Sequence, residues 1–295
     1  MMIRKTVFST IFSLLCLTYS QAQELQLSDN SLVWELSGKG MNNSSYIVLT
    51  TSNTCETQVS LLKKVAGIAD KINVYYTESN VNDPENSKEA QKFAFVGQGD
   101  KNIADLLPAA SYEKVKTKLA AMKVDEKAMI SFTPFMIFNI LSRSITPECN
   151  KVNQTEETFR SYALQRKYEV KSLFLLEEAF SFITAYGNDY YVQGIEDIVE
   201  NEEKIKEVLK TKASLYADEE IAGIQKLYGS TFFLNSRFKN KELENKRIAM
   251  LTEKIVLATQ KGAVIISIDI TNVMSPEYNL FSELRKQGYT INAYK

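Results

Sequence analysis

Strand and helix patterns alternate at both ends of this chain, and this alternation constrains the fold more than any other feature of the sequence. In the N-terminal part, two strand patterns around a glycine-containing turn lead through a helix pattern to a third strand pattern. In the C-terminal part, a helix pattern closed by Gly262 leads to a β-branched strand, a helix and a last strand. Because a connecting helix allows strands to run parallel, each part is expected to form a βαβ-like unit. The predicted strands are 32–36, 46–49, 72–76, 263–270 and 289–293, and the predicted helices are 59–69, 241–260 and 278–286.

The segment between these two units has mostly helical spacing. Residues 80–101 are polar and predict a long surface loop with room for one short element, whereas residues 103–145 and 155–212 predict helices, one of which starts or kinks at Pro134. We therefore expect an α/β (α+β) fold. The two βαβ-like units would form one mixed sheet, with a helical insertion at about residues 103–240 between them, and residues 23–295 would make a single domain.

The first 22 residues have the pattern of a secretory signal peptide. Basic residues at positions 4 and 5 precede an apolar run that ends near Leu17, and Ser20-Gln21-Ala22 follows with small residues at its first and third positions. The apolar run is shorter than the roughly 20 residues that a membrane-spanning helix needs, and no later segment reaches that length without charges. We expect a secreted or periplasmic protein that begins near Gln23 and does not span a membrane.

The charge of the mature chain argues against nucleic acid as a partner. Of 35 Lys and Arg residues, two lie in the signal peptide, so 33 remain against 36 Asp and Glu, a net charge of −3. Phosphate binding needs concentrated positive charge, and here the basic residues are dispersed.

Two cysteines, Cys55 and Cys149, remain after the signal peptide. An exported protein meets an oxidising compartment, in which such a pair can stay bonded. A bridge would close a loop of roughly 95 residues and stabilise the fold by about 4 kcal/mol on the chain-entropy model. Two buried thiols are the alternative interpretation.

The sequence contains no histidine. Ser-His-Asp and Cys-His nucleophiles need an imidazole base, and most catalytic zinc sites need imidazole ligands. An enzyme with this sequence would depend on carboxylates, lysine or tyrosine, and the composition therefore favours a protein that is not an enzyme.

Several segments, in order, resemble the TraB/GumN (Tiki-like) family. Residues 31–36, SLVWEL, followed by SYIV at 45–48, are similar to the opening strands of the family, and LRKQGY at 284–289 is similar to its terminal helix and strand. The likeness also includes ADLLP at 104–108 and the pair Glu177-Glu178, and it covers nearly the whole mature chain. The resemblance implies peptide-bond hydrolysis by a divalent metal held through two glycine-histidine motifs and carboxylates.

The positions that carry this chemistry in the family hold other residues here. The first glycine-histidine motif aligns on residues 49–52, where Ser52 stands for the histidine, and the second aligns on 270–273, which lacks both glycines and the histidine. Two expected glutamates align on Tyr75 and Phe174, and an expected arginine aligns on Glu244. The resemblance thus implies a degenerate binding site at Thr50, Ser52, Tyr75, Phe174, Glu244, Asn272 and Val273.

We therefore expect a pseudoenzyme without a cofactor, whose old cleft binds a peptide or an exported protein. The alternative is a metal-dependent hydrolase or protease, in which acids such as Glu78, Asp269 or Glu277 bind a hard divalent cation; convergence of these acids would favour it. Asp269 is the one acid in its apolar strand, and the simpler interpretation places it on an exposed side. A third hypothesis is a structural or assembly role in the envelope. The sequence does not fix the oligomeric state.

Overall fold

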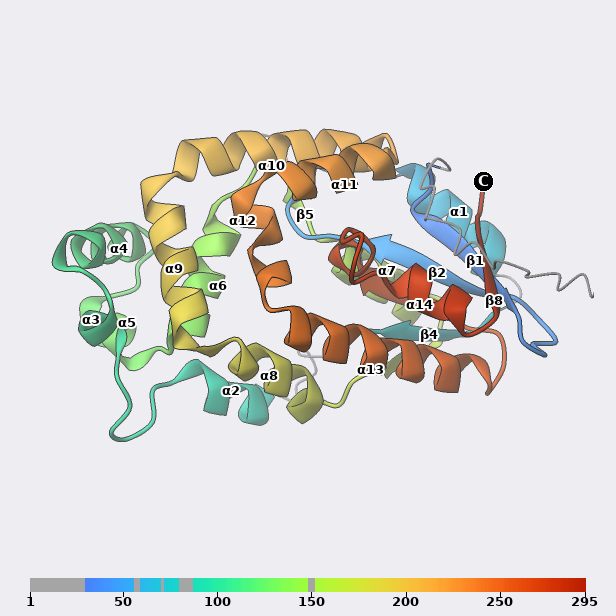
Figure 1. The fold of residues 1–295 in the computed structure, drawn as a ribbon, viewed down its shortest axis with the longest axis horizontal. Coiled ribbons are helices and arrows are strands. Elements are labelled where there is room, and N and C mark those ends of the chain that lie inside the picture. The colour runs from blue at the N-terminus through green and yellow to red at the C-terminus, as the bar shows by residue number, and fades with distance from the viewer. Residues whose placement is uncertain (1–29, 56–58, 70–71, 80–86, 148–151) are drawn as a thin grey trace, which may run out of the picture.

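A six-stranded mixed sheet forms the centre of the computed structural model, which describes residues 30–55, 59–69, 72–79, 87–147 and 152–295 (Figure 1). The strand order is β6-β4-β7-β2-β1-β8. Strands β6, β4, β7 and β2 run parallel, whereas β1 is antiparallel to both of its neighbours. The bounds are β1 Val33–Gly38, β2 Ser45–Thr50, β4 Val74–Thr77, β6 Glu169–Ser172, β7 Ile265–Asp269 and β8 Tyr289–Ala293.

The two βαβ-like units interlock within this sheet. Helix α1 (Val59–Ala69) lies between β2 and β4 in the chain, and α14 (Leu280–Lys286) lies between β7 and β8. Strand β7 of the C-terminal unit is inserted between β2 and β4 of the N-terminal unit. Its residues Ile265, Ile266 and Ile268 are at most 1% exposed, as expected for a parallel strand covered on both faces. The predicted fold class is confirmed.

The predicted helical insertion is also present. Thr133 accepts a hydrogen bond from the Met136 N–H and Pro134 occupies the first turn of α6, so this proline starts a helix rather than kinking one. The segment's helices are α2 Ser87–Ala94, α3 Ile103–Leu106, α4 Ala109–Ala121, α5 Glu126–Ser131, α6 Pro134–Ser144, α7 Thr155–Gln165, α8 Leu176–Ala185, α9 Gly187–Glu200, α10 Glu202–Ala217, α11 Ile221–Ser230 and α12 Phe232–Asn235. A 3-10 turn, η2 (Ser236–Lys239), leads into α13 (Lys241–Thr259).

One strand of the sheet lies within residues 155–212, where the sequence predicted helices. Strand β6 has the polar sequence EVKS and pairs only on one side, with β4. A short, half-exposed edge strand lacks the apolar period that distinguishes strand from helix in a sequence, which explains the error.

A second, short sheet pairs β3 (Thr54–Cys55) with β5 (Val152–Asn153) and sets Cys55 opposite Val152. Cys149, the predicted partner of Cys55, lies outside the described residues, as does the predicted signal peptide.

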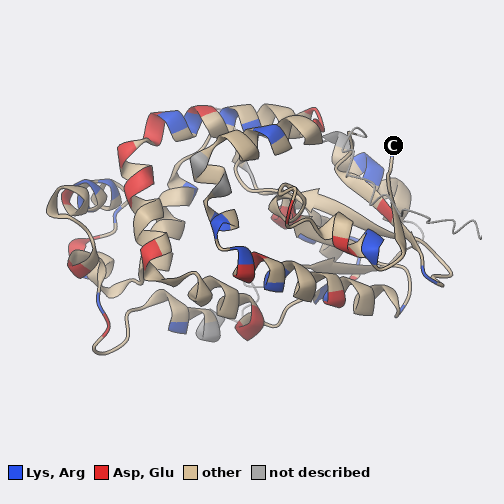
Figure 2. Cartoon of the chain, viewed as in Figure 1, with Lys and Arg blue, Asp and Glu red and all other residues tan. Residues whose placement is uncertain are grey.

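The helical insertion has its own apolar core beside that of the sheet. Buried side chains of α3 to α6 meet those of α9 and α10, among them Ile103, Val115, Leu119, Met129, Ile137, Leu141, Ile195, Ile198 and Leu209. Charges of both signs are spread along the outer helices (Figure 2). Within the described ranges, no helix is both long and apolar enough to cross a membrane.

The central position of β7 predicts that its side chains dominate stability. Ile268→Ala should lower the free energy of unfolding by roughly 2–5 kcal/mol, because Ile268 is fully buried and its loss leaves a cavity. Leu257→Ala on α13 is the matched control, since Leu257 is 47% exposed, and should change stability by less than about 1 kcal/mol. Urea denaturation of both variants measures the difference, and equal losses would contradict the assignment of β7 to the core.

Candidate functional site

Polar side chains converge where the parallel strands β2, β7 and β4 end. Thr50 lies opposite Asp269 in the β2–β7 register. Glu156, in the first turn of α7, reaches this edge: its carboxylate accepts hydrogen bonds from Ser267 at 2.7 Å and from Thr50 at 3.2 Å. The Tyr75 hydroxyl on β4 donates to Ser267 Oγ at 2.8 Å. Hydroxyl groups of β2 and β7 therefore bind one carboxylate, and the hydroxyl of β4 binds the Ser267 hydroxyl of β7.

A second group of polar side chains adjoins the first. Glu78, just after β4, accepts hydrogen bonds from the Asn272 side-chain amide and, at 2.7 Å, from the Asp269 N–H. The Asn272 carbonyl oxygen in turn accepts from Arg247 of α13, and Asn272 is fully buried. Asn272 thus connects an acid at one strand end to an arginine on a covering helix.

Glu244 holds two arginines at the far side of this network. Its carboxylate lies 3.1 Å from Arg247 Nη2 and 3.3 Å from Arg237 Nη2, and it accepts a short hydrogen bond from Tyr186. Burial opposes ionisation of Glu244, but the charges of Arg237 and Arg247 outweigh it and hold its pKa below the usual value. One ionised carboxylate is therefore shared by two guanidinium groups.

The pKa values of the two acids near the strand ends, Glu156 and Glu78, shift in the opposite direction to that of Glu244. Burial raises the pKa of Glu156 to about 7, with the charge of Glu78 adding to the shift and the Ser267 and Thr50 hydroxyls opposing it. Burial also raises the pKa of Glu78, although the charge of Arg247 acts in the opposite direction. Burial therefore favours the protonated form of both acids.

Lys212 of α10 fixes the loop that follows β2. Its amine, in a side chain only 4% exposed, donates to Thr51 Oγ1 at 3.0 Å and to the Ser52 carbonyl at 3.2 Å. Burial lowers the pKa of Lys212, and the charge of Asp269 opposes this shift. A lysine amine therefore lies against the segment in which the family resemblance implies a metal-binding histidine.

These residues do not fit the divalent metal that the resemblance implies. The lone pairs of Glu78 and Glu156 accept hydrogen bonds from the protein, and the basic groups of Lys212 and Arg247 adjoin the place that a cation would take. Across the ranges that the structure describes, no three His, Cys, Asp or Glu side chains are grouped so as to hold a metal ion.

The three acids named for a carboxylate-based metal site have different surroundings. Glu78 and Asp269 come together at the strand ends, and Asp269 accepts hydrogen bonds from the Thr271 N–H and hydroxyl. Asp269 is half-buried, and the four residues before it on β7 are all buried rather than alternately exposed, so the expectation of an exposed strand face is wrong. Glu277 is 59% exposed and pairs with Lys241 at 3.3 Å, outside the cluster.

The seven positions expected to form a degenerate binding site divide into two groups. Thr50, Tyr75, Glu244 and Asn272 belong to the polar networks described above. The other three do not contribute side chains to them: Ser52 has an exposed side chain, Phe174 packs against Phe182, and Val273 is fully buried among apolar residues.

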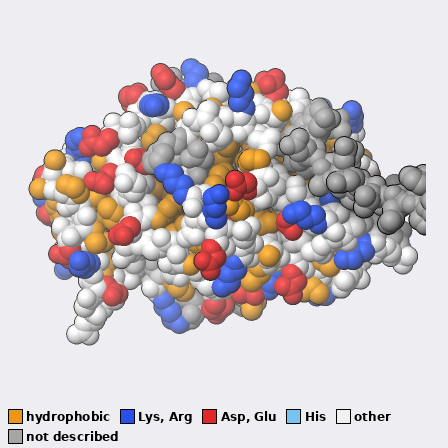
Figure 3. Space-filling view, viewed as in Figure 1, with side chains coloured by type: hydrophobic (Ala, Val, Ile, Leu, Met, Phe, Trp, Pro, Cys, Tyr) orange, Lys and Arg blue, Asp and Glu red, His pale blue; other side chains and the backbone are white. Residues whose placement is uncertain are grey.

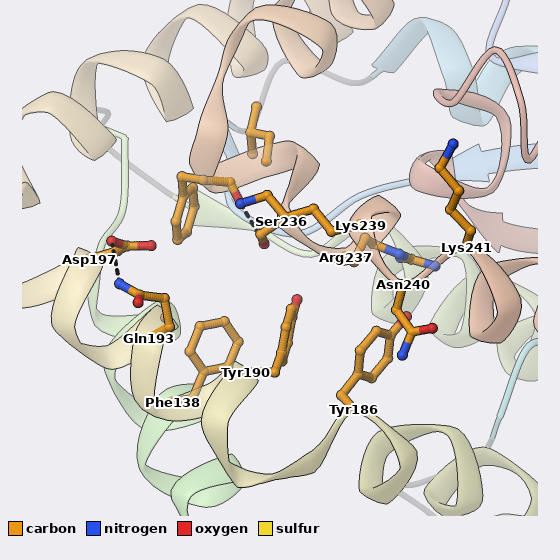
Figure 4. Close-up of a pocket in the computed structure, with 13 residues that line it drawn as sticks. Phe138, Tyr186, Tyr190, Gln193, Asp197, Ser236, Arg237, Lys239, Asn240 and Lys241 are labelled. Carbon is orange, nitrogen blue, oxygen red and sulfur yellow. Dashed lines mark hydrogen bonds between the residues drawn. The ribbon is translucent and has the colours of Figure 1, made fainter. Parts of the chain in front are cut away.

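An open cavity of about 560 Å³ adjoins this network, between α9 and the α12–η2 segment (Figure 4). Apolar side chains are visible at the centre of this face, among basic ones (Figure 3). Tyr186 and Arg237 line the cavity and also bind Glu244. The lining comprises Phe138, Tyr186, Tyr190, Phe233 and Leu234; Gln193, Gly194, Asp197, Ser236 and Asn240; and Arg237, Lys239 and Lys241.

Gly194 creates room for the aromatic wall of the cavity. A Cβ atom at this position would lie 2.6 Å from Phe138 Cε2, so any larger residue would push the Phe138 ring. The Tyr186 and Tyr190 rings lie next to each other, with centroids 4.7 Å apart and a 30° angle between the planes. The aromatic surface is thus built from α6, α9, the turn before α9 and, through Phe233, α12.

Sequence reasoning did not find Glu156, Ser267, Arg237 or Lys212, nor the cavity. For Lys212 a signal was present: it is spaced three residues from Leu209 and four from Tyr216, on the buried face of its helix. For the others the partners are distant in sequence, by 111 residues for Glu156 and Ser267, and no local pattern indicates them.

The raised pKa of Glu156 predicts a pH-dependent stability. In the unfolded chain this acid ionises near its usual value of 4.5, whereas in the fold it keeps its proton to about pH 7, so stability falls as the pH rises through this interval. Glu156→Gln should remove that loss and be more stable than wild type by roughly 1–3 kcal/mol at pH 8, with little difference at pH 4.5. Thermal unfolding across this pH range measures the effect.

The matched control is Glu157→Gln, which makes the same charge change at the next, exposed residue of α7. It should keep the wild-type pH profile. A wild-type profile in Glu156→Gln as well would show that Glu156 does not titrate in this interval.

Comparison with known proteins identifies a family for this chain. The sequence model of the TraB/PrgY/gumN family matches residues 32–293, which run from the start of β1 to the end of β8. No curated protein and no solved structure matched the chain. Since the family match covers both βαβ-like units and the helical insertion between them, this chain belongs to the TraB/PrgY/gumN family.

Proposed function

We propose that this chain is an exported peptide-binding protein that keeps the fold of its family without metal-dependent hydrolysis. One observation carries the proposal: the strand ends are filled by the protein's own acids and cations, while an open, aromatic-lined cavity lies directly beside them. Its volume of about 560 Å³ lies within the range of small-ligand sites. Aromatic walls with a few polar groups suit a short peptide segment.

The groups that metal-dependent catalysis would require are engaged in other contacts in this chain. A metal-bound water needs an open coordination site and a base. Here Arg247, Asn272 and Glu78 form a hydrogen-bonded chain, and Lys212 binds the loop after β2. Opening the strand ends to a metal would leave these groups buried without partners, which costs free energy for each of them.

A specific observation supports a second candidate, a hydrolase that uses carboxylates to bind a divalent cation. Glu78 and Asp269 adjoin each other at the strand ends, and their charges add to the raised pKa of Glu156. Calorimetric titration of the purified chain with zinc, manganese, calcium and cobalt separates the two candidates. Tight, stoichiometric binding that Glu78→Gln abolishes would support the hydrolase and contradict the binding protein; we expect no such binding.

Peptide binding is expected to depend on the aromatic wall. Tyr190→Ala should weaken binding of acetyl-Ala-Ala-Ala-Phe at least about 10-fold, because truncating a central aromatic residue removes buried contact area. Gly194→Ala should also weaken it, since the added Cβ displaces Phe138. Isothermal calorimetry measures both. Phe95→Ala is the control: Phe95 is 49% exposed and does not line the cavity, so binding should be unchanged.

Export and disulfide formation belong to the same proposal. The signal-peptide pattern places the mature N-terminus near Gln23, and an oxidising compartment favours a bond between Cys55 and Cys149. Mass spectrometry of protein recovered from the periplasm or medium should show this N-terminus and one cross-linked peptide. Reduction, or Cys55→Ser, should then lower the free energy of unfolding by up to about 4 kcal/mol. Retention of residues 1–22 in protein that stays in the cytoplasm would contradict export.

A further inference from the structure

One face of helix α9 forms a wall of the cavity. Four lining residues follow one another along this face at spacings of three, four and seven residues, so their side chains share one stripe of the helix. They are Tyr190, Gln193, Gly194 and Asp197. Seven residues of helix rise about 10 Å, so the first and the last of them stand about two turns apart. The stripe therefore has an aromatic end and an acidic end (Figure 4).

Asp197 is the acid among the residues that line the cavity, and it is half-buried. Its side chain accepts a hydrogen bond from the Gln193 amide at 3.3 Å, and within the described part of the chain no Lys or Arg forms an ion pair with it. An amide is neutral, so this bond leaves the negative charge in place. A carboxylate has about four acceptor sites, and most of those of Asp197 therefore remain open to a ligand.

The basic residues of the lining are engaged by the protein itself. Arg237 donates to the Glu244 carboxylate. Lys241 lies 3.3 Å from the Glu277 carboxylate, and Lys239 has a partner as well. Arg237 and Lys241 also lie across the cavity from the aspartate (Figure 4). The charge that a ligand can pair with in this cavity is therefore the negative one.

Aromatic rings adjoin this acid. Phe138 of α6 lies against Gly194, which is one helical turn before Asp197, and its ring centroid is 6.4 Å from that of Tyr190. The face of an aromatic ring attracts a cation. The Tyr190 hydroxyl makes no hydrogen bond to a described residue and extends toward the middle of the cavity, so it is available to a ligand as well. The acidic end therefore suits a cationic group that has apolar neighbours.

We propose that this cavity binds a peptide through a primary ammonium group at Asp197 and an aromatic or large apolar side chain on Tyr186 and Tyr190. An ammonium has three N–H donors and forms charge-assisted hydrogen bonds with a carboxylate. The two ends of the stripe, about 10 Å apart, are spanned by about three residues of extended chain. Both the α-amine of a first residue and a lysine side chain carry this group. The inference rests on the proposed peptide-binding function and adds the charged group that the peptide must carry.

The test compares three peptides by calorimetry on the mature full-length chain. Ala-Ala-Ala-Phe has a free α-amine, acetyl-Ala-Ala-Ala-Phe has no ammonium, and acetyl-Lys-Ala-Ala-Phe carries the ammonium on a side chain. At least one of the two ammonium peptides should bind at least about 10-fold more tightly than acetyl-Ala-Ala-Ala-Phe, and the tighter of them identifies the source of the group. Equal binding of all three would overturn the ammonium inference while leaving peptide binding intact. No binding of any peptide would overturn the proposed function and the inference with it.

Two variants distinguish Asp197 from general charge effects. Asp197→Asn removes the charge at nearly constant shape, so it should reduce the preference for the ammonium peptide to less than about 2-fold. Its binding of acetyl-Ala-Ala-Ala-Phe should stay as in wild type, which also shows that the variant is folded. Asp189→Asn makes the same change at an exposed residue of the same helix that does not line the cavity, and should keep the full preference. A full preference in Asp197→Asn, or an equal loss in Asp189→Asn, would contradict an ammonium site at Asp197.

Discussion

The insertion of β7 between β2 and β4 is the constraint on which the rest of the structure depends. It brings residues 265–269 into register with residues that precede them by more than 180 positions, with Thr50 opposite Asp269 and Tyr75 opposite Ile265. Since parallel strands end at the same edge, this pairing gathers Glu78, Asp269 and the 3-10 turn η3 (Ile270–Val273) in one place. The pairing thus gathers the strand-end residues, and the helices that pack on this edge add Glu156, Lys212 and Arg247.

The buried charges of the site share hydrogen-bond and ion-pair partners. Removing one member of such a network leaves the others desolvated without compensation, so its residues are linked in energy as well as in space. Glu244 provides the clearest case, with Arg237, Arg247 and Tyr186 all bound to its carboxylate. Through Arg237 and Tyr186, this network also supports one wall of the cavity.

The sequence predicted those helices and strands whose spacing of apolar residues matches their buried face. The buried strands β2, β7 and β8 and the long helix α13 carry strong patterns, and the family resemblance agreed with them. Strand β6 was missed because an edge strand with the sequence EVKS buries little, and Asp269 was misplaced because β7 is covered on both faces rather than alternating.

The site was less predictable than the fold for a physical reason. The hydrogen bonds from Arg247 to Asn272 and from Ser267 to Glu156 depend on how helices α13 and α7 pack on the sheet. No local sequence pattern encodes that packing. The absence of histidine is evident from the sequence, and it excludes a site that uses an imidazole of this chain as base or metal ligand. The cavity could not be read in this way, since its walls come from segments between Phe138 and Lys241.

The position of β7 along the chain also has a consequence for biogenesis. The strand that completes the middle of the sheet occupies residues 265–269 of 295, and the edge strand β8, residues 289–293, must then pair with β1 near the other end. During synthesis from the N-terminus, β2 and β4 therefore have no partner between them until almost the whole chain has been made. A chain with this order of strands cannot complete its central sheet until its C-terminal residues have been made.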